Sequence, residues 1–123
     1  MVAAAGNSGC SGDTVIYPAK YNEVIAVSAI NDDDDSFAYF SSCGSAVDLT
    51  APGVSILSTY KGSTYRLLSG TSMATPHVTG TAALVLSQFS PTTRPSPTRI
   101  MAHLKQTAED LELPAKQRII NLK

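Results

Sequence analysis

The sequence predicts an α/β domain in which apolar helices cover a mostly parallel sheet. The first observation is a set of short runs of branched apolar residues, which are typical of strands buried on both faces. The second is a pair of later segments with helical signals, at 72–88 and 95–111. The third is the composition, because 43% hydrophobic and 15% charged residues are typical of a chain with a packed core. We expect one unit over 1–123, with no repeat or linker.

The expected strands are short and are separated by turn-forming residues. Turn-rich residues 6–13 and a block of aspartates at 32–35 predict loops. A hairpin is expected around KGS, between two runs that could pair. The expected strands are MVAAA (1–5), NEVIAVSAI (22–30), AVDLTAPG (46–53), the two hairpin strands VSILSTY (54–60) and TYRLLSG (64–70), and RIINLK (118–123).

The two expected helices carry different signals. The segment 72–88 is rich in Ala, Leu and Val. The segment 95–111 has Ser96 ahead of Pro97, which predicts an N-cap followed by proline in the first helical position. One of its faces is expected to pack inward, because apolar residues recur there at helical spacing: Ile100, Met101, Leu104, Ala108 and Leu111.

Charge and hydropathy exclude some classes of partner. A formal net charge of −1 with no basic cluster argues against nucleic-acid binding. Apolar runs such as AALVL are too short to cross a bilayer, so no membrane partner is expected. No secretory signal is visible after Met1. Cys10 and Cys43 cannot form a structural zinc site by themselves, and they are either free buried thiols or a disulfide, which would indicate an oxidising compartment.

The stretch LLSGTSMATPHVTG places a hydroxyl at the expected start of a helix. If the helix begins at Ser72, the unpaired N–H groups of its first turn lie beside that hydroxyl and could stabilise an oxyanion. Gly70 would let a substrate backbone approach closely. His77 is not expected to be the base, because five residues along a helix separate two side chains by about 140°. The alternative for Ser72 is a helix N-cap. His77 is expected to be a structural residue with its ring buried among small residues.

The segment GTSMATPHVTG (70–80) resembles the nucleophile motif of the subtilisin-like serine proteases. Further segments resemble that family in the same order, and the resemblance covers nearly the whole chain: VAAAGNSG, YPAKYNEVIAVSAI, FSSCGSAVDLTAPGVSILST and RIINLK. The resemblance implies the C-terminal half of a three-layer α/β/α fold with a mostly parallel sheet. It also implies that peptides or proteins are the substrates.

The resemblance assigns roles to individual residues. Ser72 would be the nucleophile, and the Asn7 side chain with the Ser72 N–H would hold the oxyanion. Ala4, Ala5 and Gly6 would line one wall of the pocket for the residue before the scissile bond. Gly70 and Thr71 would flank the site. Ile16 would stand at the pocket floor and favour small or short apolar residues there.

A weak cation site is also implied by the resemblance. Its ligands would be the backbone carbonyls of Ala19, Tyr21 and Val24 with the Asp48 carboxylate, which suit calcium or sodium. The alternative is a turn whose carbonyls face water. No cofactor is expected to be required for the chemistry itself.

The sequence lacks the other members of a catalytic triad. The family carries Asp, His and Ser in that order, and neither an HGTHVAG-like nor a DTG-like segment is present. We therefore expect residues 1–123 to be the Ser-bearing part of a catalytic domain, to need the N-terminal half as a partner, and to be inactive alone. MVAAA would then be an exposed sheet edge that favours self-association. The resemblance also suggests a secreted protein.

Two other functions are consistent with parts of the sequence. The chain could be a non-catalytic binding or structural module that keeps the half-fold, although such a module would not need Ser72 and Asn7 together. It could also bind phosphate through GNSGCSG (6–12). That segment lacks the G-K-[ST] ending of a phosphate-binding P-loop.

Overall fold

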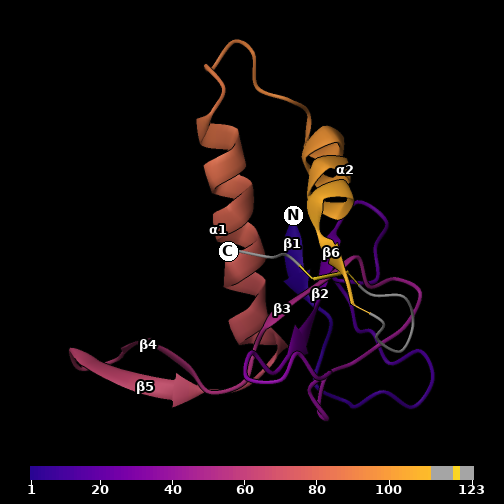
Figure 1. The fold of residues 1–123 in the computed structure, drawn as a ribbon, viewed down its shortest axis with the longest axis vertical. Coiled ribbons are helices and arrows are strands. Elements are labelled where there is room, and N and C mark those ends of the chain that lie inside the picture. Colours follow the sequence, from indigo (N-terminus) through magenta and orange to yellow (C-terminus); the bar gives the residue numbers. More distant parts are fainter. Residues whose placement is uncertain (112–117, 120–123) are drawn as a thin grey trace.

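The computed structural model describes residues 1–111 and 118–119, which form a central sheet with helices above it (Figure 1). The sheet has the strand order β1-β2-β3-β7-β6. Its parallel part contains β1 (Val2–Ala4), β2 (Ile25–Ile30), β3 (Leu49–Pro52) and β7 (Arg118–Ile119). The antiparallel edge strand is β6 (Glu109–Asp110). The mostly parallel sheet predicted from the apolar runs is confirmed.

The register of the sheet brings two chain segments together at one end. Ala4 pairs with Val27, and Val27 pairs with Leu49, so β1, β2 and β3 run side by side. Residues 5–7 therefore leave β1 at the same edge at which the chain leaves β3. In parallel α/β sheets this carboxyl-end edge is where ligand sites are built.

Both helices lie on one face of the sheet (Figure 1). α1 (Thr71–Ser87) buries Ala74 and Val78, and α2 (Pro97–Thr107) buries Ile100 and Leu104. These side chains share one core with residues of β2 and β3: Ile25, Val27, Ala29, Leu49 and Ala51. α1 packs across β1, β2 and β3, which fixes its first turn over the carboxyl end of the sheet.

The opposite face of the sheet is covered by connecting segments. A second core cluster joins Ala3 and Ala5 to Val15, Ala19 and Val24. These last residues belong to the long connection between β1 and β2. Within the described residues, therefore, the helical layer is on one side and a loop layer is on the other.

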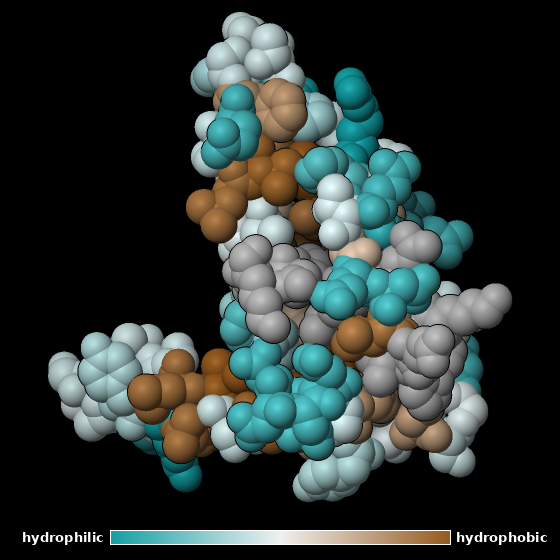
Figure 2. Space-filling view, in the orientation of Figure 1, coloured by the Kyte–Doolittle hydropathy of each residue, from teal (hydrophilic) through white to brown (hydrophobic). Residues whose placement is uncertain are grey.

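A two-stranded hairpin extends away from the body of the molecule (Figure 1). β4 (Ile56–Tyr60) pairs antiparallel with β5 (Thr64–Leu68), as predicted around KGS. Leu57 and Leu67 are largely exposed, at 64% and 59%. Figure 2 shows apolar surface where the hairpin meets the body. The hairpin leads directly into α1.

The bounds of several elements differ from the predictions. The first helix covers 71–87 instead of 72–88, because its N-cap residue is Gly70 and the helix begins at Thr71. The second ends at Thr107, since Ala108 is extended and the chain enters β6, which was not predicted. Its Ser96 cap is confirmed, with the hydroxyl accepting a hydrogen bond from the Arg99 N–H. Of the last predicted strand, 120–123 lies outside the described residues.

No helix in the described ranges has the length and apolarity that a bilayer span requires.

Candidate active site

Ser72 lies in the first turn of α1, next to a glycine with an unusual backbone conformation. Gly70 is the N-cap residue at φ 157°, and it makes no side-chain cap. Its N–H donates to the Gly53 carbonyl at 2.8 Å, which ties the start of α1 to the end of β3. A side chain at Gly53 would lie 2.6 Å from the Ala29 Cβ and 2.9 Å from the Gly70 carbonyl oxygen. The N-cap interpretation of Ser72 is therefore wrong, because Ser72 follows the cap.

The Ser72 side chain is exposed and has no hydrogen-bond partner among residues 1–111 and 118–119. Its backbone N–H is likewise unpaired within the described part of the chain, as expected for the first turn of a helix. A hydroxyl and a free N–H on the same residue are thus presented to solvent. This is the arrangement that an acyl-transfer nucleophile requires.

The Asn7 side chain reaches the same turn from the end of β1. Its amide oxygen accepts hydrogen bonds from the Thr71 N–H and from the Thr71 hydroxyl, each at 3.0 Å. The Thr71 hydroxyl oxygen in turn accepts from the Gly6 N–H at 3.3 Å. Because a backbone N–H can only donate, the amide oxygen must face Thr71 and the amide nitrogen must face away.

Two donors face one open space beside Gly70. The position that a Cβ would take at Gly70 lies 3.4 Å from Asn7 Nδ2 and 3.8 Å from the Ser72 backbone nitrogen. That space stays open because residue 70 is glycine. An oxygen atom bound there could accept from both donors after small movements, which is how an oxyanion is stabilised.

Shallow hollows lie on both sides of Ser72. One, of about 310 Å³, is bordered by the hairpin and α1 and is lined by Ile56, Leu57, Met73 and His77. The other, of about 450 Å³, lies between β1 and α1 and is lined by Ala4, Thr75 and Thr79. Ser72 and Pro76 line both. Ser72 therefore stands on a ridge between two open surfaces.

His77 lies near Ser72 without contacting its hydroxyl. The His77 Nδ1 is 3.0 Å from the Met73 carbonyl oxygen, so this nitrogen carries a proton and donates to the helix backbone. The ring is half-buried and lines the hollow beside Ser72, rather than being fully buried as predicted. The expectation that His77 has a structural role agrees with this bond.

Some residues predicted for the wall and the floor of the substrate pocket lie close together. Ile16 is 50% exposed, and its N–H donates to the Ala5 carbonyl at 2.9 Å. A Cβ at Gly6 would lie 3.2 Å from Ile16 Cγ1, so the isoleucine side chain covers the glycine. Ala4 lines the hollow beside Ser72. Gly6 and Ile16 are thus adjacent, as the predicted roles require.

Two predicted substrate contacts need correction. Ala5 is fully buried in the cluster on the loop-covered face, so only its backbone is available to a ligand. The Thr71 side chain is also buried, at 1% exposed, and holds Asn7 and Gly6 instead of facing the solvent. The positioning role of Thr71 was missed by sequence reasoning. Its only sequence signal is its place beside Ser72.

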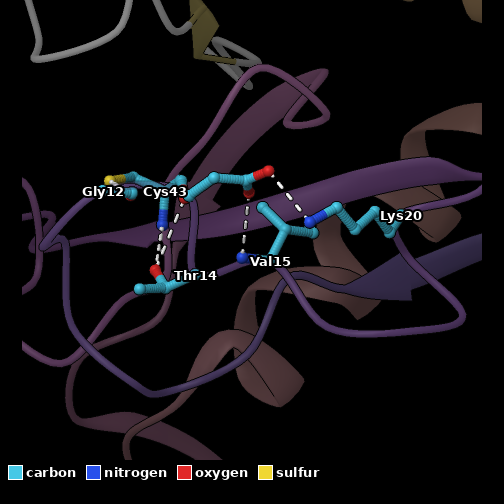
Figure 3. A network of polar contacts seen from close by, with 6 residues as sticks. Gly12, Thr14, Val15, Lys20 and Cys43 are labelled. Carbon is cyan, nitrogen blue, oxygen red and sulfur yellow. Dashed lines mark hydrogen bonds and ion pairs between the residues drawn. The ribbon is translucent and has the colours of Figure 1, made fainter.

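A disulfide closes the loop that carries Ile16. Cys10 and Cys43 are bonded, with a Cα–Cα distance of 5.1 Å, so of the two alternatives the structure has the disulfide. The Cys43 N–H donates to the Thr14 hydroxyl at 3.1 Å, and the Thr14 N–H donates to the Cys43 carbonyl at 2.9 Å. Figure 3 shows this network together with Lys20, whose ammonium pairs with the Asp13 carboxylate at 2.9 Å. The segment before Ile16 is therefore held firmly against residue 43.

At the predicted cation site, the Lys105 ammonium would compete with a cation for the Asp48 carboxylate. The Asp48 carboxylate is paired with the Lys105 ammonium at 2.7 Å and also accepts the Ala26 N–H at 3.0 Å. The Tyr21 carbonyl accepts the Val24 N–H at 3.0 Å. In the described ranges no cluster of three or more His, Cys, Asp or Glu residues could hold a metal ion. Both Asp48 oxygens are thus already engaged in this structure, one by the Lys105 ammonium and one by the Ala26 N–H.

The glycine-rich loop is not arranged as a phosphate cradle. The Gly6 N–H donates to the Thr71 hydroxyl, the Ser8 N–H to the Ser42 hydroxyl, and the Gly9 N–H to the Phe40 carbonyl. A phosphate-binding loop needs such groups to point at the ligand. This argues against the phosphate-binding alternative.

Comparison with known proteins shows which family this chain resembles. The subtilase family matches residues 1–120. Subtilisin DY of Bacillus licheniformis is 52% identical over 113 residues, covering 90% of this chain and 40% of that protein. Subtilisin E of Bacillus subtilis (strain 168) is 59% identical over 90 residues, covering 72% of this chain and 23% of that protein.

Solved structures show the same fold. A cold-adapted subtilisin-like serine proteinase superposes with a TM-score of 0.83 at 34% identity, covering 95% of this chain and 42% of the other. The self-cleaved protease domain of PatA gives 0.76 at 40% identity, covering 86% of this chain and 40% of the other.

The fold and the Ser72 site therefore define a subtilisin-like α/β protein. The chain belongs to the subtilase family, and it spans less than half the length of the relatives that it matches.

Proposed function

We propose that these residues form the nucleophile-bearing part of a serine endopeptidase that cleaves peptides or proteins through an acyl-enzyme on Ser72. The observation that carries this proposal is the pair of donors, Asn7 Nδ2 and the Ser72 N–H, facing the open space at Gly70. In the reaction the Ser72 oxygen attacks the scissile carbonyl. The carbonyl oxygen, now negatively charged, accepts hydrogen bonds from those two donors.

The proposal requires a base from elsewhere. The hydroxyl proton of Ser72 must pass to a neighbouring group, and a histidine usually serves. The sequence contains only His77 and His103. His77 uses Nδ1 on the Met73 carbonyl, and His103 lies on α2, away from both hollows beside Ser72. We therefore place the histidine and aspartate of the triad outside residues 1–123, which is consistent with the shorter span of this chain.

The substrate preference is proposed from the position of Ile16. Its branched side chain covers Gly6 where the resemblance places the pocket for the residue before the scissile bond. The disulfide and the Thr14–Cys43 hydrogen bonds hold this loop in place, so the side chain cannot easily withdraw. A small or short apolar residue fits such a pocket, and a large aromatic ring would meet the isoleucine.

The remainder of the catalytic domain is proposed to dock at the β1 edge. β1 pairs with β2 alone among the described strands, so one of its sides has unpaired backbone groups. Without a neighbouring strand, this edge favours self-association. Light scattering on residues 1–123 tests this point, and a monodisperse monomer would count against it. The disulfide supports an oxidising, extracellular location.

The proposed function is tested by labelling with a fluorophosphonate, which reacts with activated serines. The full chain in which these residues occur is labelled, digested and analysed by mass spectrometry. Label on Ser72, with none on the neighbouring exposed Ser69, is the expected result. Loss of label in Ser72→Ala is the matched control. A folded full chain that takes no label at Ser72 would support the non-catalytic module instead.

A further inference from the structure

The ion pair between α2 and the start of β3 occupies the only charged ligand of the predicted cation site. Lys105 lies in the last turn of α2, and its ammonium is 2.7 Å from one oxygen of Asp48. The other Asp48 oxygen accepts the N–H of Ala26 in β2 at 3.0 Å. The Asp48 side chain is only 15% exposed. Both oxygens of this mostly buried carboxylate are therefore used, while the Lys105 side chain is 43% exposed.

A metal ion would compete directly with this ammonium. Calcium or sodium at Asp48 would need a carboxylate oxygen as its charged ligand, since the other expected ligands are neutral carbonyls. A second positive charge placed beside the ammonium would be repelled by it. The Lys105 ammonium already supplies the compensating charge. Because the ammonium is covalently attached to the chain, its occupancy of the site does not depend on the concentration of any ion in solution.

We propose that Lys105 replaces the metal ion at Asp48, so that this part of the fold is independent of calcium and sodium. The ammonium neutralises the carboxylate and joins α2 to β2 and β3. The inference does not depend on the proposed peptidase activity, because it concerns only how α2 is attached to the sheet. Removing the ammonium should expose Asp48 and turn the site into one that binds a cation.

The test counts bound ions in the full chain in which these residues occur. Calcium is titrated calorimetrically into the wild-type protein, Lys105→Met, and Lys105→Met combined with Asp48→Asn. Methionine retains an apolar stem while removing the charge, and Lys61→Met in the exposed hairpin turn is the matched control. Lys105→Met is expected to bind one more calcium ion than wild type, and the double variant is expected to lose that ion.

Thermal unfolding provides a second readout, which does not require that the heat of calcium binding be detected. Calcium should raise the Tm of Lys105→Met by about 3 °C more than it raises the Tm of wild type or of Lys61→Met. Lys105→Arg, which keeps the charge, should behave as wild type does. If Lys105→Met does not fold, Asp48→Asn in the wild-type background still shows whether a metal ion binds at Asp48. This variant should fold, because asparagine keeps an acceptor for the Ala26 N–H. Unchanged calcium stoichiometry in Asp48→Asn supports the proposal.

Two results would overturn the inference. One is loss of a bound calcium ion when Asp48→Asn is made in the wild-type protein, which would place a metal at Asp48 despite Lys105. The other is a folded Lys105→Met protein that gains no ion.

Discussion

The side-chain oxygen of Asn7 accepts two hydrogen bonds from Thr71, one from its backbone N–H and one from its hydroxyl, each 3.0 Å long. This pairing sets the orientation of the amide, because neither donor could bond to the amide nitrogen. Asn7 Nδ2 consequently faces the space beside Gly70 before any substrate arrives. A donor that is already oriented stabilises developing charge without a reorganisation cost.

Asn7→Ala is expected to lower kcat in the complete enzyme by about 10²–10³-fold with little change in KM, a magnitude taken from the corresponding asparagine of subtilisin itself. The reason is that the donor acts on the oxyanion and not on the bound substrate. Steady-state kinetics with a peptide substrate measure both constants. Asn22→Ala, a change at an exposed asparagine outside the site, is the control and should leave both unchanged. A rise in KM of the same size, with kcat unchanged, would refute this role.

Thr71→Val is expected to lower kcat by about tenfold and to destabilise the fold by about 1–2 kcal/mol. Valine removes the hydroxyl, so Asn7 loses one of its two bonds and the buried Gly6 N–H loses its acceptor. Thr71→Ser should restore both properties. Thr59→Val in the exposed hairpin is the control for stability. Parallel measurement of kcat, KM and urea unfolding checks the result, and an unchanged kcat would show that Thr71 does not position Asn7.

Ile16→Ala is expected to broaden the substrate preference. Truncation opens the wall beside Gly6, so kcat/KM for a substrate with phenylalanine before the scissile bond should rise at least about tenfold relative to one with alanine. Leu84→Ala on the exposed side of α1 is the matched truncation and should not alter the ratio. A wild-type preference for large aromatics would contradict the assignment.

Lys20→Met is expected to raise the pKa of Asp13. The hydrogen bond from Lys20 is the main reason that the pKa of this carboxyl lies below its ordinary value of 3.8, and the same bond raises the pKa of Lys20 above 10.5. The Asp13 contribution to stability is therefore complete above pH 3.8 and is lost as pH falls through its lower, folded-state pKa. The Lys20 contribution is complete below pH 10.5 and is lost as pH rises through its higher, folded-state pKa.

Carboxyl carbon chemical shifts measured by NMR across the acid range check this expectation. The pKa of Asp34 is lowered by hydrogen bonds with Ser36 and is the internal control, because Lys20 takes no part in it. The Asp13 titration should move upward in Lys20→Met while the Asp34 titration stays in place. Coincident Asp13 curves in the two proteins would show that the ion pair does not persist in solution.

Local signals predicted much of the fold. The apolar run at 22–30, the KGS hairpin and the Ser96 cap each depend on neighbouring residues, and each is present in the structure. The end of α2 was missed because residues 108–111 continue the helical pattern, while tertiary pairing draws Glu109 and Asp110 into β6. Tertiary contacts override propensity at such positions.

The site was only partly predictable, for a related reason. Ser72 and Asn7 were identified by resemblance, but the Asn7–Thr71 bonds join residues 64 positions apart in the sequence. No spacing rule shows that Thr71 is buried or that Ala5 faces the loop layer. The Lys105–Asp48 pair likewise spans 57 positions and depends on how α2 lies on the sheet.

The most direct test of the central claim compares peptide hydrolysis by purified, folded residues 1–123 with hydrolysis by the full chain in which they occur. If Ser72 depends on a base outside these residues, the shorter chain should be slower by about 10⁶-fold, a factor taken from removal of triad residues in subtilisin itself. Turnover by residues 1–123 within about a hundredfold of the full chain, and abolished by Ser72→Ala, would contradict the claim, because the base would then lie within these residues.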